Sequence, residues 1–301
     1  MITVKIPATS ANVGSGFDSL GLALTLYNEI TVEKSDRLLI ESLDDTPVPQ
    51  GEDNLIYTAM RGLYRQCGEK IPALHIRQIN RIPMSRGLGS SSACIVGGLL
   101  AANALLGSPL TRQQLLNTAA KIEGHPDNVA PALLGGFVCA VIEGAQVRWV
   151  RQDLRPDLRF AALIPNFELS TSVARSVLPR EIPHRDAVYN LSRAALMSMS
   201  LAAGRYENLS AASGDRLHQP YRLRLITGAE EALGILHAQG AYCSYISGAG
   251  STLMAMVPAA DEAFFERTRR ELDTAGFSQW SLLMLDADNA GAVCTEMQKE
   301  K

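Results

Sequence analysis

The stretch "RIPMSRGLGSSSACIVGGLLAANALLG", residues 81–107, constrains the fold more than any other part of the sequence. It opens with a segment rich in Gly and Ser, and the run from residue 93 to residue 107 carries no charged side chain. That run is shorter than the roughly 18–20 apolar residues needed to span a bilayer. We therefore predict a buried helix in a soluble protein, with a sharp turn where the helix begins.

The glycine-rich turn itself has two readings that the residues alone leave open. G-x-G occurs at residues 14–16, 87–89 and 248–250, each time after an extended segment. "GLGSSSA" is either a tight strand-to-helix turn, where glycine supplies a positive φ, or an anion site lined by backbone amides at the positive end of a helix dipole. It matches neither G-x-x-x-x-G-K-[ST] nor G-x-G-x-x-G followed by a ribose-binding acid. A phosphate loop here would be of a third kind.

Composition excludes several classes of partner. The chain has 301 residues and a formal net charge of -3, so it offers no basic surface for nucleic acid or anionic lipid. Its five cysteines are odd in number and widely spread, which predicts neither a disulfide framework nor a CxxC metal site. The N-terminus "MITVKIPATSANVG" lacks the basic and apolar regions of a secretion signal. These features favour a cytoplasmic protein.

Strands and helices mix without strict βαβ alternation, which favours an α+β fold in two domains over a Rossmann arrangement. The Pro-containing "DLRPD" predicts a boundary that separates residues 1–154 from residues 155–301. Expected strands cover residues 2–8, 28–34, 38–43, 73–79, 137–142, 146–152, 159–166, 241–247, 251–257 and 278–285. Besides the opening stretch, expected helices cover 54–68, capped by Asp53 or Asn54, 110–124, capped by Thr111, and 185–203, 205–212, 228–239 and 261–275.

Three motifs in order along the chain resemble those of the GHMP small-molecule kinases. "PMSRGLGSSSA" (83–93) resembles the nucleotide loop P-x-x-x-G-L-G-S-S-A of that superfamily. "KIPATSANVGSGFDSLGLAL" (5–24) is similar to its first motif, and "SGAGSTLMA" (247–255) to its third. Within the superfamily, "GHPDNVAPALLGG" (124–136) and "QPYR" (219–222) resemble the homoserine kinase family in particular. The resemblance covers essentially the whole chain.

This resemblance implies a fold and an activity. The fold is α+β with two GHMP kinase domains: an N-terminal nucleotide-loop domain with a left-handed βαβ unit, and a C-terminal ferredoxin-like α/β sandwich. The implied activity is ATP-dependent phosphorylation of the side-chain hydroxyl of L-homoserine, which gives O-phospho-L-homoserine in threonine biosynthesis. ATP and Mg²⁺ are the implied cofactors, and a homodimer is the implied assembly. Two alternatives stay open: another GHMP kinase, acting on mevalonate or a related alcohol, and a catalytically silent ligand-binding relative.

The family pattern also assigns nucleotide and metal residues. The second serine of the loop, Ser91, would ligate Mg²⁺ together with Glu123, which could instead be a solvated acid in the last turn of its helix. Asn54 and Tyr57 are nominated for adenine, although either could simply cap and pack their helix. The remaining nucleotide residues are Pro83, Arg86, Gly87, Leu88, Gly89, Ser90, Ser92, Ala93, Gly248 and Gly250.

A site for homoserine must bind a zwitterion with a terminal hydroxyl, so it needs an acid for the ammonium and arginine for the carboxylate. The resemblance places Asn12 and Asp18 at the amino acid. It assigns the carboxylate to Arg175 and Arg222, which outside their motifs would be read as solvated surface residues. Substrate residues expected in addition are Thr171, His125 and Asn128.

No side chain is expected to act as the general base. Mevalonate kinases carry an Asp where this chain has Asn128, and an amide cannot accept a proton at neutral pH. We therefore expect the γ-phosphate or solvent to receive the hydroxyl proton, with Asn128 and Asn12 orienting the nucleophile and Arg175 completing the catalytic set. His125 lies near the reacting hydroxyl in this reading, or else caps a turn.

Overall fold

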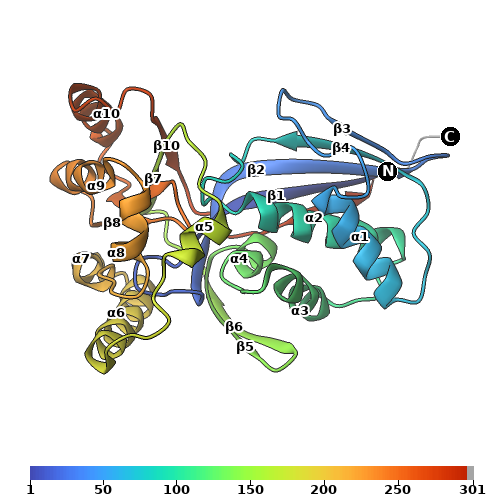
Figure 1. Cartoon of the computed structure of the whole chain (residues 1–301), viewed down its shortest axis with the longest axis horizontal. Coiled ribbons are helices and arrows are strands. Elements are labelled where there is room, and N and C mark those ends of the chain that lie inside the picture. The colour runs from blue at the N-terminus through green and yellow to red at the C-terminus, as the bar shows by residue number, and fades with distance from the viewer. Residues whose placement is uncertain (297–301) are drawn as a thin grey trace.

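The computed structural model describes residues 1–296, whose strands form two sheets (Figure 1). The first sheet contains β1 (Ile2–Ala11), β2 (Leu20–Lys34), β3 (Leu39–Ser42), β4 (Leu74–Asn80), β5 (Phe137–Glu143), β6 (Gln146–Gln152) and β11 (Val293–Glu296). Its order is β11-β1-β2-β4-β3, and the long strand β2 also pairs with β5, which pairs in turn with β6. The expected βαβ unit is formed by β3, the following helix and β4, because β3 and β4 are parallel.

Four helices cover one side of the first sheet (Figure 1). They are α1 (Leu55–Gln66), α2 (Ser90–Leu105), α3 (Arg112–Glu123) and α4 (Val129–Leu134). The side chain of Asn54 accepts backbone N–H groups at the start of α1, and Thr111 forms a capping box with Gln114 at the start of α3. The sequence-based caps are therefore confirmed, with Asn54 rather than Asp53 on α1.

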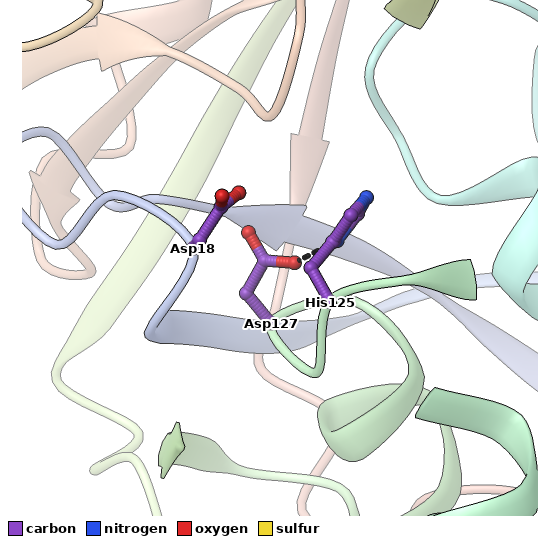
Figure 2. Close-up of side chains that lie close together, drawn as sticks. All are labelled: Asp18, His125 and Asp127. Atoms are coloured by element: carbon purple, nitrogen blue, oxygen red, sulfur yellow. Dashed lines mark hydrogen bonds and ion pairs between the residues drawn. The ribbon is translucent and has the colours of Figure 1, made fainter. Parts of the chain in front are cut away.

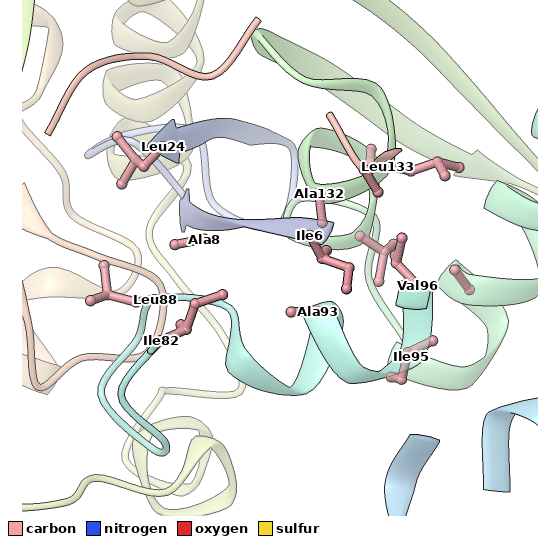
Figure 3. Close-up of a cluster of buried hydrophobic side chains, with 14 of the residues drawn as sticks. Ile6, Ala8, Leu24, Ile82, Leu88, Ala93, Ile95, Val96, Ala132 and Leu133 are labelled. Atoms are coloured by element: carbon pink, nitrogen blue, oxygen red, sulfur yellow. The ribbon is translucent and has the colours of Figure 1, made fainter. Parts of the chain in front are cut away.

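The uncharged helix α2 lies between the sheet and neighbouring helices, which explains why it has no polar face. Its residues Ala93 and Val96 face the strands beside Ile6, and α4 adds Leu133 to the same cluster (Figure 3). All of these side chains are almost fully buried. Burial of each of the larger side chains, Ile6, Val96 and Leu133, stabilises the fold by about 1.5–3 kcal/mol. This packing holds the glycine-rich turn at the N-terminus of α2 in place.

The second sheet has the ferredoxin-like topology that the resemblance implied. Its strands are β7 (Leu158–Ile164), β8 (Cys243–Ile246), β9 (Leu253–Pro258) and β10 (Ser281–Leu285). They are all antiparallel in the order β10-β7-β9-β8. The helices α9 (Ala229–Ala238) and α10 (Phe264–Thr274) pack on this sheet and on each other. The chain order of strand, helix, two strands, helix and strand is that of a split βαβ fold.

Four shorter or more exposed helices lie between β7 and α9: α5 (Thr171–Ser176), α6 (His184–Ala203), α7 (Leu209–Ala212) and α8 (Gln219–Arg222). Sequence analysis predicted α6 and the region of α7, but not α5 or α8, which are too short for a clear helical period. Among residues 1–296, no helix is both long and apolar enough to cross a membrane.

The last strand that the structure describes, β11, belongs to the first sheet. β11 pairs antiparallel with β1, from Ile2 opposite Glu296 to Lys5 opposite Val293. Sequence analysis did not predict β11, because four exposed residues leave no alternation of apolar and polar side chains. A boundary at residue 154 stays a prediction, and the topology adds that β11, although it follows that boundary, joins the first sheet.

Candidate active site

The glycine-rich turn adopts a conformation that only glycine accommodates easily. Gly87 and Gly89 have φ values of 77° and 73°, and Gly89 is the N-cap of α2. A Cβ on Gly87 would lie 2.2 Å from the Ser247 carbonyl oxygen, and one on Gly89 would lie 1.9 Å from Thr9 Oγ1. Both glycines therefore meet two requirements at once: a left-handed backbone and close approach of other segments.

The third motif lies against the glycine-rich turn at Gly87 and Gly89. Ser247 of that motif is 160 residues away from Gly87 along the chain. Ser247 Oγ donates a hydrogen bond of 2.6 Å to the Gly87 carbonyl oxygen, and Thr252 N–H donates one of 3.0 Å to the Arg86 carbonyl. Gly248 N–H bonds to the Ala11 carbonyl at 3.1 Å, so the first motif joins the same assembly. The three motifs that the sequence singled out therefore meet in one place.

Asn12 links the first and third motifs through both ends of its side-chain amide. Its Nδ2 donates to the Gly248 carbonyl oxygen at 2.8 Å, and its Oδ1 accepts the Asp18 backbone N–H at 3.0 Å. Asn12 and Asp18 both have positive φ, which Asn and Asp tolerate better than most residues. Asn12 thus fixes the position of Asp18.

The meeting point of the motifs is a cavity of about 190 Å³. All the expected substrate residues line it, together with most of the expected loop residues. These are Asn12, Asp18, Arg86, Gly87, Gly89, Ser90, Ser91, Glu123, His125, Asn128, Thr171, Arg175, Arg222, Gly248 and Gly250. Sequence analysis did not name the other lining residues, Ser85, Asp127, Leu169, Ser170 and Ala249.

Two arginines and one acid dominate the charge at one side of the cavity. Arg175 binds the Asp18 carboxylate through two hydrogen bonds, of 2.7 and 3.1 Å. This contact raises the pKa of Arg175 above its usual value. Arg222 is 1% exposed, and burial, with a contribution from Arg175, lowers its pKa to about 10. Both guanidinium groups therefore stay charged at neutral pH, next to a carboxylate.

His125 and Asp127 form a close side-chain pair among the residues that line the cavity (Figure 2). His125 Nδ1 lies 2.5 Å from Asp127 Oδ1, and Asp127 is only 2% exposed. Burial alone would lower the pKa of His125, but Asp127, Glu123 and Asp18 together raise it above the usual value. The candidate ligand atoms of Asp18, His125 and Asp127 all lie within 4.8 Å of one another. Asp127 could have been nominated from "HPDN", where it is the one acid between two expected substrate residues.

Asn128 is oriented by the first strand and by its neighbour. Thr9 Oγ1 donates a hydrogen bond of 2.7 Å to Asn128 Oδ1, which fixes the nitrogen Nδ2 as the donor end of the amide. Nδ2 donates a hydrogen bond of 3.4 Å to Asp127 Oδ1. Asn128 therefore presents donor N–H groups to the cavity wall, in keeping with an amide that cannot act as a base.

Oxygen ligands suited to a divalent cation gather where α2 begins and α3 ends. Glu123 Oε1 accepts hydrogen bonds from Ser91 Oγ at 3.0 Å and from Ser92 Oγ at 2.8 Å. Ser91 and Glu123 line the cavity, whereas Ser92 is fully buried. One carboxylate and a hydroxyl fit Mg²⁺, which usually takes one or two protein oxygens beside phosphates and water. The donor set therefore fits the metal that the resemblance implied.

The two expected adenine residues lie together at the start of α1, where Asn54 Oδ1 accepts the Tyr57 backbone N–H at 3.4 Å. Asn54 lines a second pocket that shares Ser85, Ser90 and Ser91 with the first. The Tyr57 side chain does not line that pocket and is buried in the hydrophobic core. Pro83, Leu88, Ser92 and Ala93 are not among the residues lining either pocket, and Leu88 instead accepts the Thr9 backbone N–H through its carbonyl.

Comparison with known proteins identifies the family of this chain. The family model for the GHMP kinases N terminal domain matches residues 54–136, and the model for GHMP kinases C terminal matches residues 197–273. A homoserine kinase of Clostridium beijerinckii is 46% identical over 303 residues, covering 99% of this chain and all of that protein. A homoserine kinase of Caldicellulosiruptor bescii is 43% identical, covering 99% of this chain and 98% of its own.

The chain belongs to the homoserine kinase family of the GHMP kinases. A crystal structure of homoserine kinase from Cytophaga hutchinsonii superimposes with a TM-score of 0.86 at 27% identity, covering 98% of this chain and 97% of that one. A mevalonate kinase of Methanococcus jannaschii, at 13% identity and a TM-score of 0.72, shares the fold and covers 95% of this chain and 98% of its own. In this homoserine kinase family member, the glycine-rich turn at Gly87 and Gly89 lies within residues 54–136, which the N-terminal family model matches.

Proposed function

We propose that the cavity transfers the γ-phosphoryl group of ATP to the side-chain hydroxyl of L-homoserine. The products are ADP and O-phospho-L-homoserine, an intermediate of threonine biosynthesis. The observation that carries the proposal is the clustering of Asp18, Arg175 and Arg222 in the same cavity as the nucleotide loop. An acid beside two arginines complements the ammonium and carboxylate of an amino acid.

In the proposed complex, one set of residues binds the charged groups of the substrate, and another set orients its hydroxyl group. In the proposed complex, Asp18 receives the ammonium group, Arg175 and Arg222 bind the carboxylate, and Thr171 assists them. Asn128 and His125 lie toward the nucleotide loop and orient the hydroxyl. Asn12 acts through Asp18, since both ends of its amide are already bonded to protein atoms. Positioning of this kind supplies much of the rate enhancement in phosphoryl transfer.

The chemical step is a single displacement at the γ-phosphorus. A bond forms between the homoserine hydroxyl oxygen and phosphorus, the bond to the β,γ-bridging oxygen breaks, and ADP leaves with that electron pair. The hydroxyl proton passes to an oxygen of the transferred phosphoryl group or to solvent. Backbone N–H groups of the loop at Gly87 and Gly89, and the Ser90 and Ser91 region of α2, stabilise the phosphate charge.

Ser91 and Glu123 are the proposed protein ligands of Mg²⁺. When bound, the ion neutralises charge on the β- and γ-phosphates. Ser92 supports the arrangement from below, because its buried hydroxyl donates to the same Glu123 oxygen. For the adenine base we propose the second pocket, with Asn54 at its wall, while Tyr57 packs in the core three residues further along the chain.

A panel of alcohol substrates tests the proposed function. Coupled release of ADP should depend on L-homoserine and on Mg²⁺, and should be far slower with mevalonate, which lacks an ammonium group for Asp18. The absence of a base at Asn128 gives a further reason to disfavour the mevalonate reaction. Rapid turnover of mevalonate or another alcohol, with none of homoserine, would refute the assignment. ATP binding without any turnover would favour a silent ligand-binding relative.

The proposed role of Arg222 in binding the substrate carboxylate leads to a separate prediction. Replacing Arg222 by Ala removes a charge-assisted hydrogen bond, so KM for homoserine should rise about ten- to a hundredfold. KM for ATP should change little, because Arg222 is not part of the nucleotide loop. Arg222→Lys should rescue weakly, since an ammonium group cannot replace a planar guanidinium. Initial-rate kinetics with each substrate varied in turn measure both effects. If KM for ATP rose and KM for homoserine did not, Arg222 would contribute to the nucleotide site and not to the carboxylate site.

A homodimer in the cytoplasm, without nucleic-acid or membrane partners, completes the proposal. The family resemblance suggests the dimer. The outer face of α6 supports it, because Leu191 and Met199 there are 72% and 68% exposed. Sedimentation equilibrium of the purified chain should give twice the mass of one chain. A single-chain mass at micromolar concentration would contradict the dimer.

A further inference from the structure

His218 lies directly behind Arg222 and is fully buried. It precedes α8, and its ring contacts the turn of the first motif as well as the arginine. We propose that His218 is a positioning residue that fixes Arg222 for the carboxylate of the amino acid. This inference deepens the proposed function and rests on it for the identity of the ligand.

Hydrogen bonds at both ring nitrogens determine the tautomer of His218. Nε2 lies 2.7 Å from the Gly14 carbonyl oxygen, which can only accept, so Nε2 must carry the proton. Nδ1 lies 3.4 Å from Nη1 of Arg222, which can only donate. A neutral ring protonated on Nε2 satisfies both contacts, whereas the other tautomer satisfies neither.

The hydrogen bonds of Arg222 leave one nitrogen free for a ligand. Nη1 donates to the Gly248 carbonyl at 2.9 Å as well as to His218, and Nε donates to the Ala174 carbonyl at 3.2 Å. Nη2 has no hydrogen-bond partner within residues 1–296, and Arg222 lines the cavity. Three contacts thus fix the plane of the guanidinium group with Nη2 available for a carboxylate oxygen.

The surroundings of His218 keep the ring uncharged. Burial lowers its pKa, Arg222 lowers it further, and Asp215 and Asp18 only partly oppose this. Asp215 Oδ2 is 3.7 Å from Nε2, but its oxygens already accept the side chain of Asn190 and the backbone N–H groups of residues 217–219. An imidazolium would turn an N–H toward the N–H groups of Arg222, which the neutral ring avoids.

Phe17 fixes the orientation of the ring. The Phe17 and His218 rings stack with centroids 5.1 Å apart and planes at 20°. The guanidinium carbons of Arg222 and Arg175 lie 5.2 and 5.6 Å from the centroid of the same Phe17 ring. The first motif therefore holds His218 and both arginines in one stack, and rotation of the His218 ring would break the bond to Arg222.

Two replacements of His218 distinguish a role in positioning Arg222 from a role in packing alone. His218→Leu gives a side chain of similar length that lacks the acceptor Nδ1. KM for homoserine should therefore rise about tenfold, while KM for ATP stays within about twofold. His218→Asn places a carbonyl oxygen near the position of Nδ1, so it should restore most of the homoserine affinity. Val257→Ala, at a fully buried position of β9, is the control for lost stability, and it should leave both KM values unchanged.

Combining variants tests whether His218 acts through Arg222. In an Arg222→Ala background, His218→Leu should add little to the KM for homoserine, because the group it positions is gone. Independent effects that multiply would show that His218 does not act through Arg222. Equal rises in both KM values, or an Asn variant as impaired as the Leu variant, would also overturn the proposal.

Nitrogen-15 NMR of histidine-labelled protein provides a readout that needs no activity. Without substrate, His218, assigned by its absence in His218→Asn, should show the neutral Nε2–H tautomer, and Arg222→Ala should shift its Nδ1 signal. An imidazolium, the Nδ1–H tautomer or an unshifted signal would refute the contact. If the wild-type protein showed this signature but did not phosphorylate homoserine, the proposed function would fail while the contact between His218 and Arg222 stood.

Discussion

Replacing Gly89 by Ala should lower kcat/KM for ATP at least a hundredfold. The residue has a φ of 73°, and its new Cβ would lie 1.9 Å from Thr9 Oγ1 and 3.3 Å from Asn128 Oδ1. Relief of these contacts must displace either the turn or the Thr9 hydroxyl that orients Asn128. Displacement of catalytic groups by about 1 Å typically costs on the order of a hundredfold in rate.

Gly107→Ala is the matched control for that replacement. Gly107 follows the other end of α2 with a φ of 81°, but a Cβ there meets nothing within 4 Å. Each variant bears a left-handed strain of about 1–2 kcal/mol, so both should melt at lower temperature. Only Gly89→Ala should lose ATP affinity, measured by titration calorimetry. Equal losses of kcat/KM for ATP in the two variants would show that Gly89 has only a structural role in the turn.

Replacing Glu123 by Gln should lower Mg²⁺-dependent turnover by on the order of a hundredfold, as expected when one electrostatic stabiliser of a transition state is lost. Gln keeps an oxygen that accepts the hydroxyls of Ser91 and Ser92, so the local packing and the melting temperature should change little. The lost charge should instead weaken binding of the metal. Calorimetric titration of Mg²⁺ into the enzyme with a non-hydrolysable ATP analogue measures that affinity directly.

Glu271→Gln removes one acid from an exposed position of α10, far along the chain from the loop, and serves as the control for net charge. It should leave turnover and Mg²⁺ affinity unchanged. If Glu123→Gln retained both at wild-type values, Glu123 would be a solvated acid at the end of its helix, and the metal would be held by other groups.

Local sequence patterns were sufficient for most of the secondary structure. Three features depend only on neighbours within a few residues: the cap at Thr111, the end of α1 and the uncharged run of α2. They could therefore be predicted from the sequence. The short helix α5 and the exposed strand β11 carry no such local signal. Their conformation depends on the segments against which they pack.

The motifs of the sequence indicated the family, the α+β fold and most, but not all, of the residues that line the cavity. Only the folded chain brought Ser247 to Gly87, joined Asp18 to Arg175, and placed His218 between Gly14 and Arg222. The contacts of Ser247 with Gly87, Asp18 with Arg175 and His218 with Gly14 span from 157 to 204 residues along the chain. Long-range contacts of this kind leave no periodicity in a sequence, because the packing of whole elements sets their distances.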